Sequence, residues 1–245
     1  MRKVAIMTSK GGTGKTTTAI NLGHGLALCG MKVLLIDCDA QRNAAIAFDI
    51  QGGKTLCDLL EYGEVDVIEA RKNLYVIDSG GRDLAEIEMK LAGRSSRERR
   101  LEMALRNLRG CDVVICDCSP TINLINLNAV AYADSVIIPV SMDYLAQAGA
   151  RQTLQIIDEF NEHASRQTAV LGILPTFFDA RTRLSREVLE SLRDRFTEKV
   201  FETVIRVNTS LREAPSFNQT IFEYSPMSRG AYDYYQLTEE FLSRG

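Results

Sequence analysis

The chain has 245 residues, 45% of them hydrophobic, and a formal net charge of −3 at pH 7. This length and hydrophobic content suit one sizeable core, so we expect a single domain over residues 1–245. No apolar run reaches the roughly 18 uncharged residues of a membrane span, and an apolar strand pattern begins at Val4 without a signal peptide before it, which predicts a cytoplasmic protein.

Apolar runs of strand length alternate with helix-like stretches along the chain. The strands are predicted at Val4–Met7, Val33–Ile36, Leu74–Ile77, Val113–Ile115, Val136–Val140, Val170–Leu174 and Val200–Ile205. The helices are predicted at Thr16–Cys29, Leu56–Tyr62, Arg97–Leu108, Leu124–Ala133, Tyr144–Ala164, Ser185–Phe196 and Ala231–Leu242.

This order predicts an α/β fold with a doubly wound, mostly parallel sheet and helices on both faces. Near-continuous Val, Ile and Leu runs are typical of strands covered on both sides, and strand–helix alternation favours right-handed βαβ units. Ligands of such sheets bind beyond the carboxyl ends of the strands. We therefore expect the chemistry in the loops after Met7, Ile36 and Ile115.

The segment SKGGTGKTT, residues 9–17, lies between the first predicted strand and helix. It fits the phosphate-loop pattern GxxxxGK[ST] at Gly14, Lys15 and Thr16, but Ser9 replaces the first glycine. The Lys15 amine would neutralise the β- and γ-phosphates of a nucleotide, and the Thr16 hydroxyl would hold Mg²⁺. The residues predicted to bind the nucleotide are Gly11, Gly12, Thr13, Gly14, Lys15, Thr16 and Thr17.

Lys10 and three aspartates are further candidates. Lys10 enters the loop at its near end, where an extra cation is better placed to reach an anion on another molecule. Asp37, Asp39 and Asp117 each follow an apolar strand run, where a buried carboxylate is costly unless a metal or a positive charge offsets it. The alternative is that each of them caps a turn.

The pattern KGGTGKT resembles the deviant Walker A motif of the ParA/MinD family. This resemblance implies that Lys10 reaches the nucleotide of a partner subunit and so acts as a dimerisation switch. KVLLIDCDAQRNAA, residues 32–45, is similar to the second family motif, which implies that Asp39 supports hydrolysis and that Asp37 lies near the metal. VVICDCSPTINLINLNAV, residues 113–130, resembles the Walker B region, with Asp117 holding Mg²⁺ through water.

The C-terminal third is similar to the short Soj-like ParA proteins, with departures in the DNA-contact segment. The family pattern IPRNVRLSEAPS would place its arginines at Val207 and Ser210. This chain instead has arginines at Arg206 and Arg212, whereas Arg181 matches a family position that the resemblance links to DNA contact. The residues predicted to contact DNA are therefore Arg181, Arg206 and Arg212.

In the alternative interpretation, the arginines only form ion pairs with Glu187, Glu190 or Glu213 on a solvated face. Asn208 keeps its family position and is a candidate contact to the purine edge. Ala40 replaces the proline that is usual in the second motif, a change that bears on the hydrolysis rate more than on ATP binding.

The resemblance implies a ParA-type ATPase that uses ATP and Mg²⁺ and positions cargo. Its implied partners are a second copy of the chain in an ATP-dependent homodimer, non-specific DNA, and a ParB-like or other adaptor that stimulates slow hydrolysis. The protein would be nucleoid-associated when ATP is bound. The chain begins with its first strand, so we expect no N-terminal helix-turn-helix extension and no operator binding.

Two other functions share this nucleotide loop. A MinD-like membrane-surface ATPase would end in a basic amphipathic helix, whereas here Glu239 and Glu240 would be repelled by anionic lipid, so no membrane partner is expected. An iron protein related to nitrogenase needs cluster-binding cysteines at a dimer interface. Cys116 and Cys118 flank Asp117 within one strand and do not match that arrangement.

Overall fold

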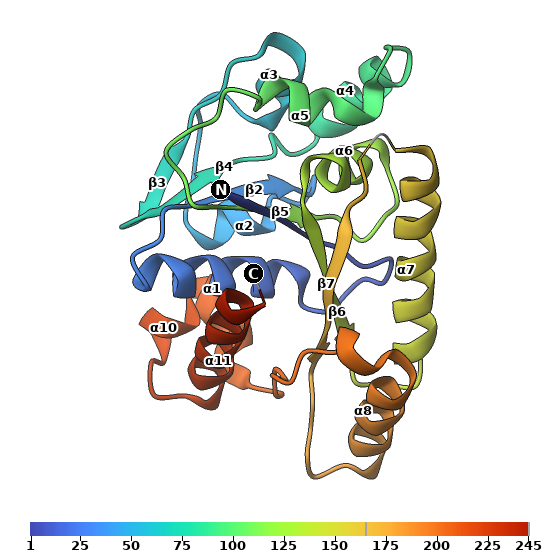
Figure 1. The fold of residues 1–245 in the computed structure, drawn as a ribbon. Helices are drawn as coiled ribbons and strands as arrows, with labels where there is room; N and C mark the ends of the chain where they lie inside the picture. Colours follow the sequence, from blue (N-terminus) through green and yellow to red (C-terminus); the bar gives the residue numbers. More distant parts are fainter. Residues whose placement is uncertain (165, 245) are drawn as a thin grey trace.

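The computed structural model describes residues 1–164 and 166–244. Within these ranges the strands form a seven-stranded sheet in the order β3-β4-β2-β5-β1-β6-β7. All neighbouring strands pair in parallel except β3 and β4, which are antiparallel. Figure 1 shows helices on both faces of this sheet. The predicted doubly wound α/β fold is confirmed.

The strands follow the apolar runs closely, because runs of Val, Ile and Leu suit positions covered on both faces. Every residue of the second, fifth and sixth strands is buried. The strands are β1 (Arg2–Ile6), β2 (Val33–Cys38), β3 (Ile68–Arg71), β4 (Leu74–Ile77), β5 (Val113–Cys118), β6 (Ser135–Ser141) and β7 (Ala169–Thr176).

One predicted strand, Val200–Ile205, is wrong. The segment lies beside β7, where the N–H groups of residues 201 and 205 donate to the carbonyl oxygens of residues 173 and 175, each at 2.9 Å. It forms no continuous strand pairing among the described residues, but two isolated bridges, Ile173 with Val200 and Phe178 with Arg206. Between these points the backbone N–H groups of residues 202 and 203 donate to the side-chain carboxylate of Glu240, at 2.9 and 2.8 Å. These N–H groups therefore bond to α11 and not to a sheet ladder.

The helices agree less well with the prediction than the strands do. The predicted helix Arg97–Leu108 is a 3-10 turn at Arg97–Arg99 followed by only five α-helical residues. None of the described helices has the length and apolar character to cross a bilayer. They are α1 (Lys15–Leu28), α2 (Asn43–Ala47), α3 (Leu56–Tyr62), α4 (Asp83–Ala92), α5 (Arg100–Ala104), α6 (Leu124–Tyr132), α7 (Ala146–His163), α8 (Arg183–Phe196), α9 (Thr209–Glu213), α10 (Ile221–Tyr224) and α11 (Arg229–Ser243).

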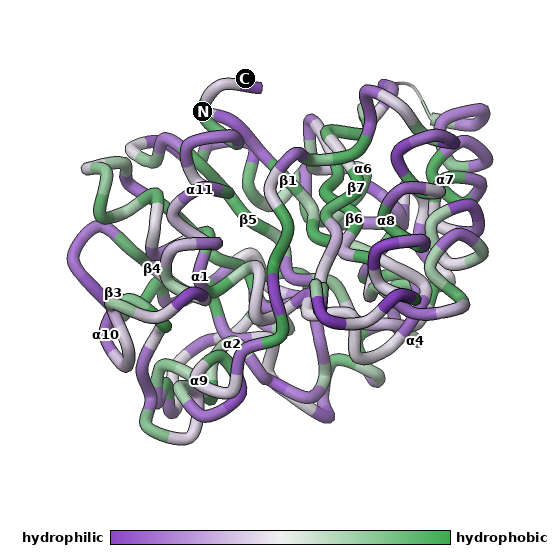
Figure 2. Tube along the Cα trace, turned by 90° about the horizontal axis from the view of Figure 1, so that it is seen from below, coloured by the Kyte–Doolittle hydropathy of each residue, from purple (hydrophilic) through white to green (hydrophobic). Residues whose placement is uncertain are grey.

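Two hydrophobic clusters, one on each face, hold the sheet between helix layers. Figure 2 shows the hydrophobic segments concentrated in central strands such as β1 and β5. Helix α1 is buried along most of its length because it lies between the sheet and the C-terminal helices. This packing fixes the N-terminus of α1 at the carboxyl end of β1, where the glycine-rich loop connects the two elements.

The six cysteines are all free thiols. Four of them are buried, Cys111 is half-buried and Cys29, directly after α1, is exposed. Burial raises the pKa of Cys118 well above its usual value, and the pKa of Cys57 to about 11. The thiols of Cys57 and Cys118 are therefore protonated near neutral pH, and the buried cysteines pack as small apolar groups.

Candidate nucleotide-binding site

The glycine-rich loop presents the N-terminus of α1 to a cavity. Gly12 and Gly14 have φ values of 70° and 87°, in the left-handed region that favours glycine. Gly14 is the residue before α1 and has no side chain to cap it. The first N–H groups of a helix lack intrahelical partners, and the helix dipole favours negative charge there. The loop is therefore built to bind an anion such as phosphate.

Two adjoining cavities meet at this loop. The larger, of about 560 Å³, runs from the loop to the turn after β2, to one face of α4 and to the loop after β5. The smaller, of about 320 Å³, lies between the end of β7 and the segment 205–215. Gly14 and Thr17 line both of them, so one elongated ligand can occupy the two cavities.

Lys15 lies at the start of α1 and is only 7% exposed. Its Nζ donates a hydrogen bond to the carbonyl oxygen of Lys10, at 3.1 Å. Burial lowers the pKa of the Lys15 amine, and the nearby Asp117 opposes that shift. A buried cation with one neutral acceptor is poorly compensated. A phosphate at the helix N-terminus would supply the missing negative charge.

Asp117 is fully buried at the carboxyl end of β5. Neither of its carboxylate oxygens accepts a hydrogen bond from the described residues. Burial raises the pKa of Asp117 well above its usual value and Asp37 adds to the shift, while the nearby Thr16 hydroxyl and Lys15 lower it. An unsatisfied buried carboxylate beside a hydroxyl is a donor set that fits Mg²⁺.

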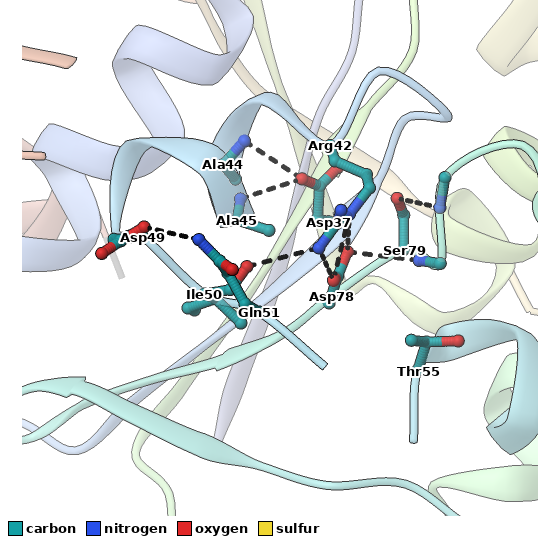
Figure 3. Close-up of polar contacts among 12 residues, drawn as sticks. Asp37, Arg42, Ala44, Ala45, Asp49, Ile50, Gln51, Thr55, Asp78 and Ser79 are labelled. Atoms are coloured by element: carbon teal, nitrogen blue, oxygen red, sulfur yellow. Dashed lines mark hydrogen bonds and ion pairs between the residues drawn. The ribbon is translucent and has the colours of Figure 1, made fainter. Parts of the chain in front are cut away.

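Asp37, paired in register with Asp117, has a different environment. Its Oδ1 accepts a hydrogen bond from the Asp39 N–H at 3.0 Å, and its Oδ2 accepts the N–H groups of Ala44 and Ala45 at 3.0 and 3.2 Å (Figure 3). Burial raises its pKa to about 7. The Asp37 carboxylate thus holds α2 to the end of β2, and Asp117 is the acid whose oxygens are left for a metal.

Asp39 lines the larger cavity and is 8% exposed. Its Oδ1 accepts a hydrogen bond from the N–H of Gln41 at 2.9 Å, which closes a tight turn. Asp39, Lys15 and Thr16 line the same cavity. The structure brings together the phosphate loop, Asp39 and Asp117 as the sequence predicts.

Lys10 contacts its own chain. Its Nζ lies 2.6 Å from Oδ2 of Asp143 and 3.4 Å from Oγ of Ser141. Asp143 also accepts hydrogen bonds from Ser141 Oγ and from the N–H of Leu145. Burial raises the pKa of Asp143, but the bonds from Lys10 and Ser141 outweigh it, and the net shift is downward. The predicted contact of Lys10 with a second chain stays a prediction.

The residues predicted to contact DNA have partners of their own. Arg206 forms an ion pair with the buried Asp233, and Arg212 lies over the ring of Phe177 at 5.9 Å. Both arginines line the smaller cavity. The Arg181 side chain is 87% exposed and pairs with Asp179 at 2.8 Å. None of these pairs uses the glutamates of the alternative interpretation, and DNA binding stays a prediction.

Asn208 also lines the smaller cavity. Its Oδ1 accepts a hydrogen bond from the N–H of Leu211 at 3.2 Å, so the side chain caps the N-terminus of α9. The amide nitrogen has no hydrogen bond to another described residue and is the part of the side chain available to a ligand. The purine contact itself stays a prediction.

One wall of the larger cavity comes from α4, a helix that is not among those predicted from the sequence. Leu84, Ala85 and Glu88 line the cavity from this helix. The buried residues of α4 are spaced three and four positions apart, at Leu84, Ile87 and Leu91. That spacing is a helical signal and could have identified the element.

The amino-acid sequence of this chain is similar to those of known proteins over its full length. The profile of a family described as an AAA domain matches residues 1–170. The sporulation initiation inhibitor protein Soj of Bacillus subtilis is 39% identical over 250 residues, which cover 99% of this chain and 98% of that protein. The chain belongs to the ParA/Soj family. The chromosome-partitioning ATPase Soj of Thermus thermophilus is another relative, at 38% identity over 100% of this chain and 96% of that protein.

A solved structure extends the comparison to ligands. The cobyrinic acid a,c-diamide synthase of Mycobacterium smegmatis, crystallised with an ATP analogue and magnesium, has a TM-score of 0.84 and 30% identity to this ParA/Soj family member. The match covers 99% of this chain and 94% of that one. The predicted family is confirmed, and the predicted cofactors, ATP and Mg²⁺, agree with the ligands of this neighbour.

Proposed function

We propose that this ParA/Soj family member is a cytoplasmic ATPase that positions cargo through cycles of slow, adaptor-stimulated ATP hydrolysis. One observation carries the proposal: at a helix N-terminus that faces a cavity, a buried lysine with one neutral acceptor lies near a buried aspartate that accepts no hydrogen bond from the described residues. Each is costly alone, and a magnesium–triphosphate would satisfy both. The Lys15 variant described in the Discussion tests it.

Each residue of the site has one part in this activity. The N–H groups at the start of α1 and the Lys15 amine bind the phosphates, and Thr16 and Asp117 would hold Mg²⁺. When bound, Mg²⁺ neutralises charge on the phosphate oxygens. Asp39, held by its turn at the edge of the cavity, orients the attacking water and accepts its hydrogen bond.

The proposal includes a homodimer in which Lys10 of one protomer contacts the nucleotide of the other. In the single chain the amine is held by Asp143 at 2.6 Å. Dimerisation would exchange this partly exposed ion pair for contact with a triphosphate, which carries more charge and is less exposed to water. The internal pair therefore opposes dimerisation until ATP is bound in the partner.

Lys10→Ala is expected to prevent ATP-dependent dimerisation while leaving ATP binding within about threefold, because Lys15 and not Lys10 holds the chain's own phosphates. Light scattering with a non-hydrolysable analogue measures the mass, and titration calorimetry the affinity. The exposed lysine variant Lys72→Ala is the control. A Lys10→Ala protein that dimerises like the natural chain would contradict the role of this residue.

Asp143→Asn is expected to strengthen ATP-dependent dimerisation by about threefold to tenfold. The neutral amide binds the Lys10 amine less strongly than the carboxylate does, so it competes less with the partner's triphosphate. Sedimentation velocity over a concentration series gives the dimer dissociation constant. The control is Asp158→Asn, which changes an exposed carboxylate on α7, the helix that follows Asp143. A weaker dimer in Asp143→Asn would show that this carboxylate supports the interface instead of competing with it.

Contact with non-specific DNA completes the proposed cycle, with the dimer nucleoid-associated and an adaptor triggering release. Arg181 supports this part best, because its side chain is 87% exposed and lies outside both cavities. A dimer would present two such surfaces to one DNA duplex. The contacts of both with DNA phosphates, which weaken as the salt concentration rises, would together strengthen the affinity of the dimer for DNA.

A further inference from the structure

Arg42 has an unusual backbone for an arginine. It lies between the turn of Asp39 and the first residue of α2, with φ 56° and ψ 29°. This left-handed conformation is uncommon for residues other than glycine, asparagine and aspartate, and it persists where surrounding contacts enforce it. The backbone N–H of Arg42 donates to the carbonyl oxygen of Asp39 at 2.9 Å, so the two residues are the ends of one turn.

The contact that enforces this conformation is an ion pair with Asp78, the residue after β4. Nε of Arg42 donates to Oδ1 and Oδ2 of Asp78 at 2.9 and 3.1 Å, and Nη2 donates to Oδ2 as well (Figure 3). Nη2 also donates to the carbonyl oxygen of Ile50 at 3.3 Å. The Asp78 side chain is 4% exposed. Two parallel hydrogen bonds to a buried carboxylate fix both the position and the orientation of the half-buried Arg42 side chain.

The loop after Asp78 is shaped to admit the arginine. Gly81 has φ 68°, and a Cβ at that position would lie 3.0 Å from Cδ of Arg42. Gly80 has φ 86°, and a Cβ there would lie 2.7 Å from Oγ1 of Thr55. Gly81 thus leaves room for the Arg42 side chain, and Gly80 leaves room for Thr55, as the chain continues into α4.

The pair therefore connects two walls of the larger cavity. Asp39, Gln41 and Asn43 line that cavity from the turn, and Leu84, Ala85 and Glu88 line it from α4. The Arg42 side chain instead extends to Asp78. Arg42 can act on a ligand only through the residues that it holds.

We infer that Arg42, anchored by Asp78, is a positioning residue that sets the orientation of the Asp39 carboxylate toward the nucleotide. The inference rests on the proposed function, in which Asp39 orients the attacking water. A small misplacement of such a group slows the chemical step much more than it weakens binding. A merely structural ion pair would instead change stability and leave the chemical step alone.

The test compares three variants with the natural chain. Asp78→Asn removes the charge without changing the shape. Arg42→Gly removes the side chain but keeps a residue that adopts φ 56° freely. The double variant Arg42→Gly/Asp78→Asn leaves no unpaired buried charge. The matched control is Glu240→Gln, since Glu240 forms a partly buried pair with Arg244 and also accepts backbone N–H groups, remote from the cavities.

Four quantities are measured: kcat and KM for Mg–ATP, the Tm, and hydrogen–deuterium exchange of residues 39–47 without nucleotide. We expect kcat to fall about tenfold in all three variants with KM within about twofold. Exchange of residues 39–47 should become about tenfold faster, because the turn loses its anchor. The Tm of Arg42→Gly should fall by about 5 °C and recover in the double variant. Glu240→Gln should lower only the Tm.

Two results would overturn the inference. One is a double variant whose kcat recovers together with its Tm, which would make the pair structural. The other is unchanged exchange of residues 39–47. If the natural chain itself hydrolyses no ATP, the proposed function fails, and the exchange data still decide whether the pair holds the turn of Asp39.

Discussion

Lys15→Ala is expected to weaken Mg–ATP binding by at least about 100-fold and to abolish measurable hydrolysis. The amine is buried, has one neutral acceptor and lies at the N-terminus of α1, so the phosphates are the charge it is placed to meet. A 100-fold loss corresponds to about 2.7 kcal/mol, which is reasonable for a charge-assisted contact shielded from water. Titration calorimetry with a non-hydrolysable analogue measures this loss directly.

The control for Lys15→Ala is Lys32→Ala, which removes the same charge from an exposed position just before β2. Strand β2 begins at the amino ends of the parallel strands, on the side of the sheet opposite the phosphate loop. The Tm of both variants is needed, since removing Lys15 leaves Asp117 without its nearest cation. If Lys15→Ala remained folded and bound Mg–ATP as tightly as the natural chain, the assignment of the phosphate site would be untenable.

Asp39→Ala is expected to lower kcat by at least about 100-fold while ATP-dependent dimerisation persists. Asp39 lines the cavity from the turn after β2, whereas the phosphates are bound by the N–H groups at the start of α1 and by Lys15. Its loss removes a group that acts on water and leaves the binding contacts in place. Phosphate release measures turnover, and light scattering with ATP measures the dimer.

Asp158→Ala, on the exposed face of α7, is the control for a lost carboxylate and should change neither measurement. An Asp39→Ala protein with natural turnover would remove Asp39 from the mechanism. A variant that neither turns over nor dimerises would mean that the turn of Asp39 forms part of the interface, and the separation of binding from hydrolysis would be wrong.

The sequence predicts the sheet and the phosphate loop well because both depend on local patterns. Buried parallel strands require continuous apolar runs, and an anion-binding loop between strand and helix requires glycines at fixed positions. Asp37 and Asp117 lie close together because neighbouring parallel strands, here β2 and β5, have their carboxyl ends on the same side of the sheet. These rules need only neighbouring residues, so a single sequence is sufficient.

The errors arise where distant segments compete for the same groups. Val200–Ile205 has strand-like composition, yet Glu240 on α11 takes two of its backbone N–H groups. The ion pair of Arg42 and Asp78 joins residues 36 positions apart that are brought together by neighbouring strands, and no local pattern announces it. The Lys10 contact with Asp143 spans 133 positions. Such pairings become visible only once the fold is known.

The distribution of the thiols offers a practical route to these measurements. A maleimide fluorophore should attach first at Cys29, because four of the other cysteines are buried and Cys111 is half-buried with a raised pKa. Helix α1 separates Cys29 from the phosphate loop by 14 residues, about 20 Å of helix. A dye there would report the proposed association of two protomers by energy transfer, without an engineered cysteine and without a change at the catalytic groups.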